Sequence, residues 1–301
     1  MPAIKGIALG FAGFLLFTAL SMFGLVLTIN VTLLNSSFAY GEVQKLNVPA
    51  VVHELVGEST PSGEKYFISG IDKAISDIKP WLDQQIHNVI FSSYDYLSGR
   101  ADGINVSIDT ADIRQTLVKS LTTSYLENAP SQYTSLPADQ KTRYLSDLQN
   151  QFLDAFPATV DINQDSIGES GMHTLQQIRT IVSYIHAVYF TLIVACVLFI
   201  LAFILLQRKM RDIFRALGLV FLASGLVVTI SFFIIRLVAP QTVVGSNLPV
   251  EIQNWVPRVI MDTISPLMIF GISLLATGLV VCVISFFLHR VDRPVSPRHS
   301  G

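Results

Sequence analysis

Four long stretches that are almost free of charged residues constrain the fold of this chain more than any other feature. Each has about 20 residues or more, and a helix of that length crosses the roughly 30 Å hydrocarbon core of a bilayer. The chain is only 14% charged, whereas soluble domains carry about 25% charged residues. We therefore predict four transmembrane helices within residues 7–34, 181–206, 216–235 and 264–288.

The segment between the first two stretches differs in its charge. Residues 35–178 carry 18 acidic and nine basic side chains, a net charge of −9 without histidine, whereas the whole chain has a net charge of −2. A segment of about 145 residues is long enough for a domain with its own core. We predict an acidic domain here, and its negative charge argues against nucleic acid as a partner.

The short segment QRKMRDIFR determines the predicted orientation, because basic residues in short loops stay on the cytoplasmic side. With four spans, the N-terminus with Lys5 and the arginine-containing C-terminal tail fall on the same face as this segment. We therefore place both termini in the cytoplasm and the acidic domain outside, in a multi-pass protein of the plasma membrane. The topology determinants in the segment are Arg208, Lys209, Arg211 and Arg215.

The predicted fold is an all-α membrane protein. It is a four-transmembrane-helix bundle with a large, mostly helical extracytoplasmic domain between the first and second spans. The predicted order is a cytoplasmic N-terminus and first span (1–34), the acidic domain (35–180), the second span (181–206), the basic loop (207–215), the third span (216–237), a short outer loop (238–262), the fourth span (263–288) and a basic tail (289–301).

The first span has an alternative interpretation as a signal peptide, with SFA at residues 37–39 before a cleavage site. The apolar run of about 28 residues exceeds the 7–15 that are typical of a signal peptide, which favours an uncleaved anchor. Cleavage would leave three spans and the same outer domain. That domain contains no cysteine, so we expect it to fold without disulfides, as is typical of a prokaryotic surface protein.

Helical periodicity dominates the acidic domain. Apolar residues at three- and four-residue spacing follow Pro80, and proline is tolerated in the first turn of a helix. We predict that one helix begins at Pro80 and ends before Gly99, after a separate helical segment around residues 71–78. The other predicted helices run from Asp109 or Thr110 to Glu127, from Ser135 to about Phe156, and from Ser170 into the second span.

Two short segments of the domain alternate between apolar and polar residues, which is the period of a half-buried strand. They are INVSIDT at residues 104–110 and TVDIN at residues 159–163. Each lies next to a long helix, so we predict that they pair as a small β-ribbon.

No motif for catalysis, cofactor binding or metal binding is present in the sequence. It lacks HExxH, GxSxG, a Walker loop, GxGxxG and a calcium-binding loop. We predict no catalytic, cofactor-binding or metal-binding residues and no cofactor. The ionisable residues near the spans are His186, Arg236 and Asp262, and all lie near the predicted outer boundary, which argues against an ion path through the membrane.

Small residues form a stripe along the first span and recur in the last two. Such faces let helix backbones approach closely, although glycine is also common in membrane helices generally. We predict tight packing, mostly within the bundle. The stripe contains Gly6, Gly10, Gly13, Ser21 and Gly24, and the seven-residue repeats are Gly218 with Gly225 and Gly271 with Gly278.

Arg236 and Asp262 flank the short loop between the last two spans, so antiparallel neighbouring helices would place them at similar depth. We predict a structural contact between them that offsets part of the cost of a charge near lipid. Arg258, one helical turn before Asp262, is a rival partner for the carboxylate.

The function predicted from these features is that of a non-enzymatic integral membrane protein. Its outer domain binds a protein partner, an envelope component or a ligand. The chain contacts the lipid bilayer and either a protein partner or a second copy of itself in a homo-oligomer. One alternative is an oligomeric channel or a subunit of a transport complex. Another is an enzyme with an active site at the membrane surface.

Overall fold

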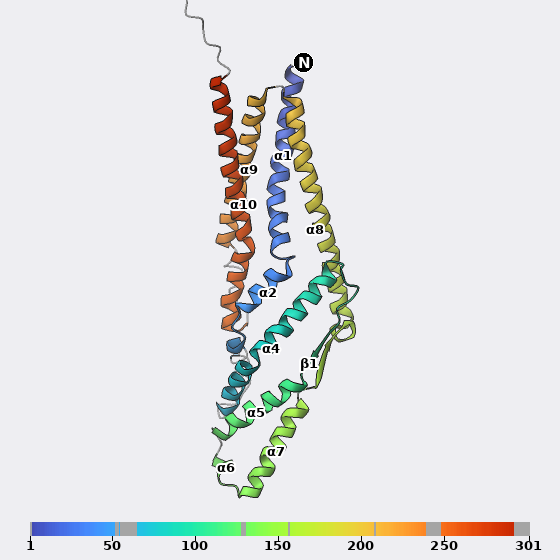
Figure 1. The fold of residues 1–301 in the computed structure, drawn as a ribbon, viewed down its shortest axis with the longest axis vertical. Coiled ribbons are helices and arrows are strands. Elements are labelled where there is room, and N and C mark those ends of the chain that lie inside the picture. Colours follow the sequence, from blue (N-terminus) through green and yellow to red (C-terminus); the bar gives the residue numbers. More distant parts are fainter. Residues whose placement is uncertain are drawn as a thin grey trace, which may run out of the picture. The chain divides into compact units, whose positions relative to one another are not determined.

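The computed structural model describes residues 2–51, 54, 65–127, 131–155, 157–207, 209–238 and 248–291. The described elements, in chain order, are α1 (Pro2–Val31), α2 (Ser36–Gln44), α4 (Lys65–Leu97), β1 (Val106–Asp109), α5 (Ala111–Glu127), α6 (Ser131–Thr134), α7 (Ala138–Ala155), β2 (Thr159–Ile162), α8 (Gln164–Leu206), α9 (Met210–Val238) and α10 (Val250–Val291) (Figure 1). Arg208 and most of the predicted basic tail lie outside the described residues.

The chain forms two compact units. We call the first the bundle unit, and it comprises Met1–Asn35, Ser183–Val244 and Pro257–Gly301. The second, the inserted unit, comprises Ser36–Val182 and Gly245–Val256. The two units share the long helices α8 and α10, since each of these begins in the inserted unit and ends in the bundle unit.

Four helices are long and apolar enough to cross a membrane, as predicted. They contain the candidate spans Gly6–Val31, Asp165–Leu206, Met210–Val238 and Val250–Leu288. Many of their large apolar side chains are exposed, among them Leu205 at 81% and Ile7 at 74%. A contiguous apolar surface of this kind is unusual on a soluble monomer and suits contact with lipid.

The core of the bundle unit joins α1, α8 and α9. Leu16 and Leu20 of α1 pack with Phe203 of α8 and with Ile213 and Leu217 of α9, and all five are buried. Burial of such side chains stabilises a soluble protein through the hydrophobic effect, but in lipid the close fit itself supplies the stability. The bundle is therefore held by packing at this end of α9.

Glycines bring α9 and α10 into close contact. A Cβ atom on Gly218 would lie 3.1 Å from the Gly278 carbonyl oxygen, and one on Gly225 would lie 2.9 Å from the Gly271 carbonyl oxygen. The seven-residue repeats of the two antiparallel helices thus face each other within the bundle. Any side chain at these positions would push the two backbones apart.

In the inserted unit, α4 runs without interruption through Pro80. The prediction that Pro80 begins a separate helix is wrong. Proline removes one backbone donor and disfavours the helical conformation of the residue before it. Packing outweighs this cost, since Ala74 and Ile75 before the proline and Tyr96 after it are all buried.

The predicted β-ribbon is confirmed. Strands β1 and β2 pair antiparallel, with Val106 opposite Ile162 and Asp109 opposite Thr159. Tyr96 from α4 and Ile104 are buried with Val106. The ribbon therefore closes the apolar face at the end of α4.

The ends of α4 and α5 follow the local sequence. Gly99 has φ of 76°, and the N–H of Arg100 donates to the Asp95 carbonyl oxygen at 2.8 Å, which caps the helix in the way a left-handed glycine allows. At the start of α5 the Asp109 carboxylate accepts a bond from the Ala111 N–H at 2.9 Å. Both predicted boundaries are confirmed.

Other helix boundaries differ from the prediction. Helix α7 begins at Ala138 rather than next to Ser135, and the N–H of Lys141 donates to the carbonyl oxygen of Pro137. Pro137 fits the start of a helix because its missing N–H would have had no partner there. Helix α8 is continuous from the second span back past Ser170 as predicted, and Gly168, with φ of 74°, marks a kink near its start.

The predicted outer loop at residues 238–262 is partly helical, because α10 begins at Val250. Pro249 precedes the helix, and the carboxylate of Glu54 accepts the Val250 N–H at 2.8 and 2.9 Å. Local sequence could not indicate this cap, since Glu54 lies almost 200 residues earlier in the chain. Residues 239–247 of the loop lie outside the described residues.

Candidate functional site

A cavity of about 380 Å³ lies in the inserted unit between α4 and the end of α2. Its volume falls within the range of about 300–1,000 Å³ that is usual for small-molecule sites. We call it the α2–α4 pocket. It is lined by Val43, Gln44, Lys45, Leu46, Asn47, Val48, Pro49, Ile75, Lys79, Leu82, Asp83 and Ile86.

One wall of the pocket is a single face of α4. Four of its lining residues on that helix, Ile75, Lys79, Leu82 and Ile86, lie at steps of three and four and so share a helix face, and Asp83 borders that face. The opposite wall is the turn that ends α2, where the N–H groups of Lys45 and Leu46 donate to the carbonyl oxygens of Glu42 and Val43. A rigid helix and a hydrogen-bonded turn therefore form the two sides.

The lining combines apolar and charged groups. Leu46, Ile75 and Leu82 offer apolar surface, whereas Lys45, Lys79 and Asp83 bring two positive charges and one negative charge. Lys45 is bonded to the carboxylate of Glu42, so the exposed Lys79 supplies the main positive charge of the lining. The lining thus favours a molecule with an apolar body and a negatively charged end.

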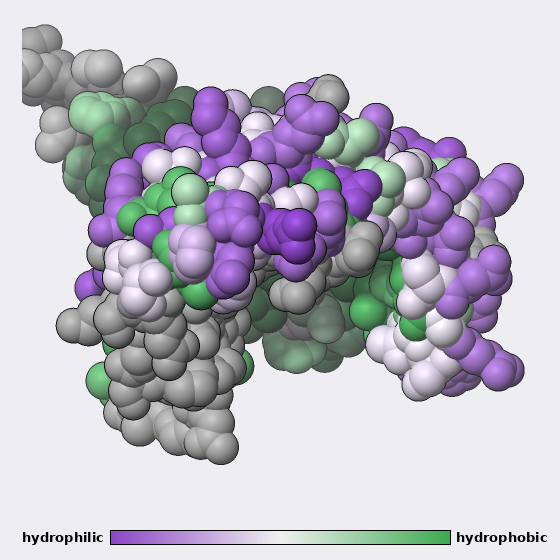
Figure 2. Space-filling view, turned by 90° about the horizontal axis from the view of Figure 1, so that it is seen from below, coloured by the Kyte–Doolittle hydropathy of each residue, from purple (hydrophilic) through white to green (hydrophobic). Residues whose placement is uncertain are grey.

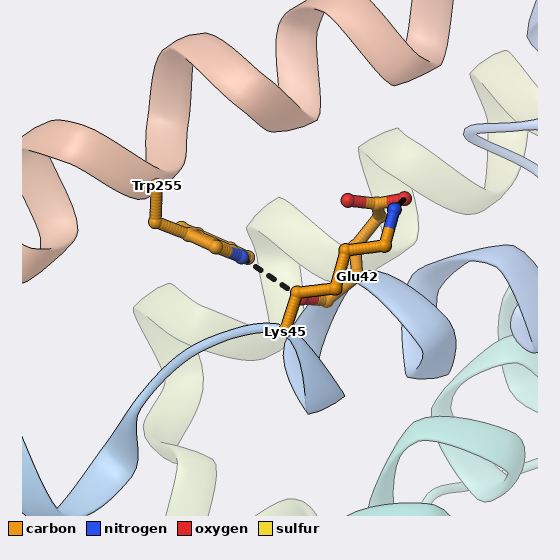
Figure 3. Close-up of polar contacts among 3 residues, drawn as sticks. All are labelled: Glu42, Lys45 and Trp255. Carbon is orange, nitrogen blue, oxygen red and sulfur yellow. Dashed lines mark hydrogen bonds and ion pairs between the residues drawn. The ribbon is translucent and has the colours of Figure 1, made fainter.

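A buried carboxylate, that of Glu42, precedes the lining residue Val43 in α2, and Figure 3 shows its polar contacts. The Glu42 residue is 5% exposed, and its Oε1 accepts a hydrogen bond from Lys45 Nζ at 2.7 Å. The Nε1–H of Trp255 in α10 donates to the Glu42 carbonyl oxygen at 2.8 Å. These contacts fasten the end of α2 to the first turns of α10 and position Lys45 at the pocket.

One atom of this cluster lacks a partner. Glu42 Oε2 is buried and accepts no hydrogen bond within the described part of the chain. A buried acceptor without a partner costs about 1–3 kcal/mol. The arrangement that holds Lys45 at the pocket thus carries an energetic cost.

Aromatic rings hold α2 against α4 next to the pocket. The ring of His87 stacks on Phe91, with 4.0 Å between centroids, and packs edge-on against Tyr40 of α2 at 5.0 Å. His87 therefore has a packing role between the two aromatic side chains. Among the described residues, no group of three or more His, Cys, Asp or Glu side chains is arranged to hold a metal ion.

A second, more open groove lies between α5 and α7 and has a volume of about 300 Å³. Its lining is mostly hydroxyl and amide, and the buried Thr122 Oγ1 has no partner among the described residues. Figure 2 shows one face of the molecule on which hydrophilic residues predominate. The groove is lined by Gln115, Val118, Lys119, Thr122, Thr123, Gln149, Asn150 and Leu153.

The residues of the predicted small-residue stripe in α1 differ in how closely other helices approach them. Cβ atoms built on Gly6 and Gly10 would meet nothing within 4 Å, whereas one on Gly13 would lie 3.5 Å from the Phe203 ring. A Cβ atom on Gly24 would lie only 2.7 Å from the ring of Phe270. Close packing in the bundle unit thus involves the second half of the stripe.

The predicted charged residues are placed as follows. Arg236 is exposed in the last turn of α9, and Asp262 is half-buried in α10. Among the described residues, no ion pair joins these two side chains, so their contact stays a prediction that a double-mutant thermal cycle would test. Lys209 precedes α9, and Arg211 and Arg215 lie in its first turns.

Sequence reasoning missed the α2–α4 pocket and the Glu42 cluster. Trp255 and Glu42 are 213 positions apart, so no local pattern relates them. No known protein family, curated protein or solved structure matches this chain. The function is therefore argued from the site itself.

Proposed function

We propose that this protein is a non-enzymatic membrane protein whose inserted unit lies outside the cytoplasm and binds a small amphipathic ligand in the α2–α4 pocket. The observation that carries the proposal is the lining of that pocket, in which apolar side chains surround two lysines and one aspartate. Apolar walls supply affinity, and a few charged groups fix the orientation of a ligand.

The charge of the lining indicates the ligand class. Lys79 is exposed on α4, and Lys45 is held by the buried Glu42. An anionic group of a ligand is attracted mainly to Lys79, since Glu42 offsets the charge of Lys45, whereas Asp83 selects against a ligand with a second negative charge nearby. We expect a monoanionic amphipathic molecule with an apolar portion that fits a cavity of about 380 Å³.

The proposed topology rests on the distribution of basic residues. Lys209 lies in the short connection between α8 and α9, and Arg211 and Arg215 lie in the first turns of α9. Basic residues in a short connection favour the cytoplasmic side. We propose a plasma-membrane protein with both termini in the cytoplasm and the pocket outside.

Blocking the pocket tests the proposed function. The full chain is purified in mild detergent and examined by native mass spectrometry for co-purified small molecules. We expect Leu82→Trp, which fills the pocket, to remove the bound species. Asn150→Trp adds the same bulk to the α5–α7 groove and serves as the matched control, which should retain the species.

The charge arm of the experiment uses Lys79→Glu, which reverses the charge at the pocket wall. We expect occupancy by an anionic species to fall about tenfold, since reversing one charge at close range changes binding by about 1.4 kcal/mol or more. Folded Leu82→Trp protein that keeps the species, or folded wild-type protein that carries none, would refute the proposal.

A further inference from the structure

A cavity of about 470 Å³ lies in the bundle unit, between the first turns of α9 and the last turns of α10. It is separate from the α2–α4 pocket, and the proposed function does not use it. We call it the α9–α10 cavity. It is lined by Arg211, Arg215, Leu219, Cys282, Ser285 and Phe286.

The lining is ordered from charged to apolar along α9. Arg211, Arg215 and Leu219 follow each other at four-residue steps, so they share one face of that helix. The two arginines lie nearest the helix start, and Leu219 lies deeper in the candidate span. On α10, Cys282 and Phe286 are also four residues apart and contribute the facing wall.

Two contacts set the distance between the walls. Ser285 Oγ donates a hydrogen bond to the carbonyl oxygen of Arg211 at 3.0 Å. About two turns further along α9 and one turn back along α10, a Cβ atom on Gly218 would lie 2.6 Å from Cys282 Sγ, so the helices touch there. The cavity is thus bounded by a hydrogen bond between the helices and by a close helix contact.

The electrostatics of this end of the bundle are positive. Segment 207–215 carries four basic residues against one acid, Asp212. Asp212 is exposed and lies about 100° around the helix from Arg211 but only about 60° from Arg215, so it offsets part of the charge of Arg215. Two arginines against one acid leave the mouth of the cavity with a net positive charge.

The apolar part of the cavity is open to its surroundings. Leu219 and Phe286 are 55% and 58% exposed, which is the exposure of side chains that face lipid in a membrane span. A small soluble anion would leave this apolar surface without contacts. An amphipathic molecule with one anionic end would contact both parts of the lining.

We propose that the α9–α10 cavity binds an anionic phospholipid. Arg211 and Arg215 contact the headgroup phosphate, because guanidinium groups bind phosphate oxygens through paired, charge-assisted hydrogen bonds. An acyl chain lies along Leu219 and Phe286. Basic pockets between transmembrane helices suit anionic headgroups for the same electrostatic reason.

The test uses the full chain in detergent, to which phosphatidylglycerol or phosphatidylcholine is added, with binding read by native mass spectrometry. We expect phosphatidylglycerol to bind about tenfold more tightly than phosphatidylcholine, and the Arg211→Gln/Arg215→Gln variant to lose that preference. Lys209→Gln removes one positive charge from the same segment without changing the lining, so it is the control and should keep the preference. If the double variant does not fold, the exposed Arg215→Gln alone should weaken phosphatidylglycerol binding severalfold.

Two further arms identify the source of the phosphate. Leu219→Asn should weaken binding of phosphatidylglycerol, because it makes the acyl-chain surface polar, and millimolar inorganic phosphate should not displace the lipid. Displacement by inorganic phosphate would show a free-anion site instead. Equal losses for Lys209→Gln and for the arginine variants would show only diffuse surface charge, and either result would overturn the proposal.

Discussion

The residue with the most unusual environment is Glu42. It is an acidic side chain with 5% exposure, one oxygen bonded to Lys45 and the other without a partner among the described residues. Its backbone carbonyl also accepts the indole N–H of Trp255. Single hydrogen bonds of this kind contribute about 0.5–1.5 kcal/mol net, and here they determine where Lys45 stands at the α2–α4 pocket.

Removing the indole donor should destabilise the protein modestly. Trp255→Phe keeps an aromatic ring but leaves the Glu42 carbonyl oxygen without this hydrogen bond. We expect the free energy of unfolding to fall by about 1 kcal/mol, measured by thermal melting in detergent. Trp81→Phe, at the only other tryptophan of the chain, is the control. An equal loss in both variants would show that ring size rather than the hydrogen bond matters.

Tyr94 in α4 gives the inserted unit a dependence on alkaline pH. Burial raises the pKa of the Tyr94 hydroxyl above its ordinary value of 10.0, because the charged phenolate is poorly solvated there. The folded state then holds the proton to higher pH than the unfolded state, so stability is fully present below pH 10 and falls as pH rises beyond it.

The matching variant is Tyr94→Phe. We expect the wild-type protein to lose stability between pH 10 and the raised pKa more steeply than this variant, in thermal melts followed from pH 8 upward. Tyr144→Phe, at an exposed tyrosine of α7, should keep the wild-type slope. Identical pH slopes for wild type and Tyr94→Phe would contradict the prediction.

Among the elements, α4 and the α9–α10 pair show how packing competes with local preference. In α4, the local preference of Pro80 predicts two helices, but buried residues on both sides of the proline stabilise a single continuous helix. In α9 and α10, four glycines lower the intrinsic helix propensity but allow the two backbones to touch. In both cases tertiary contact decides the outcome.

Adding a methyl group at the α9–α10 contact should be costly. A Cβ atom on Gly225 would lie 2.8 Å from the Leu275 backbone nitrogen, so Gly225→Ala forces the helices apart. We expect a loss of about 1–3 kcal/mol in thermal stability. Gly10→Ala is the matched control, because its Cβ atom would meet nothing within 4 Å and alanine is the better helix former. A neutral Gly225→Ala would show that the helices can separate without cost.

At the scale of the whole molecule, the chain combines a bundle of apolar helices with an acidic inserted unit. Segment 207–215 carries four basic residues against one acid, whereas residues 35–178 carry a net charge of −9. Positive charge in a short loop resists transfer across the membrane, whereas a long segment is translocated largely regardless of its charge. The proposed orientation follows from this difference.

Cysteine labelling of intact cells tests the orientation. In a background in which Cys196 and Cys282 are replaced by serine, Gln140→Cys should react with a membrane-impermeant reagent from outside. Lys209→Cys should react only after lysis. Reaction of both positions from the same side would be incompatible with four spans and a segment 207–215 in the cytoplasm.

Much of the fold could be predicted from the sequence because the relevant forces act over short distances. The four candidate spans follow from the length of apolar runs, and the β1–β2 ribbon follows from an alternation over a few residues. The end of α4 at Gly99 and the cap of α5 by Asp109 are likewise local hydrogen-bonding arrangements. These two helix ends depend on residues within about one helical turn of each other.

Only the tertiary structure decided the continuity of α4 through Pro80 and the start of α10 at Val250. The first depends on apolar faces buried against other elements, and the second on a carboxylate, Glu54, from a distant part of the chain. The Glu42–Trp255 contact and both cavities arise in the same way. Such sites join side chains brought together by packing, and packing depends on the shape of the whole unit, which no short pattern of residues encodes.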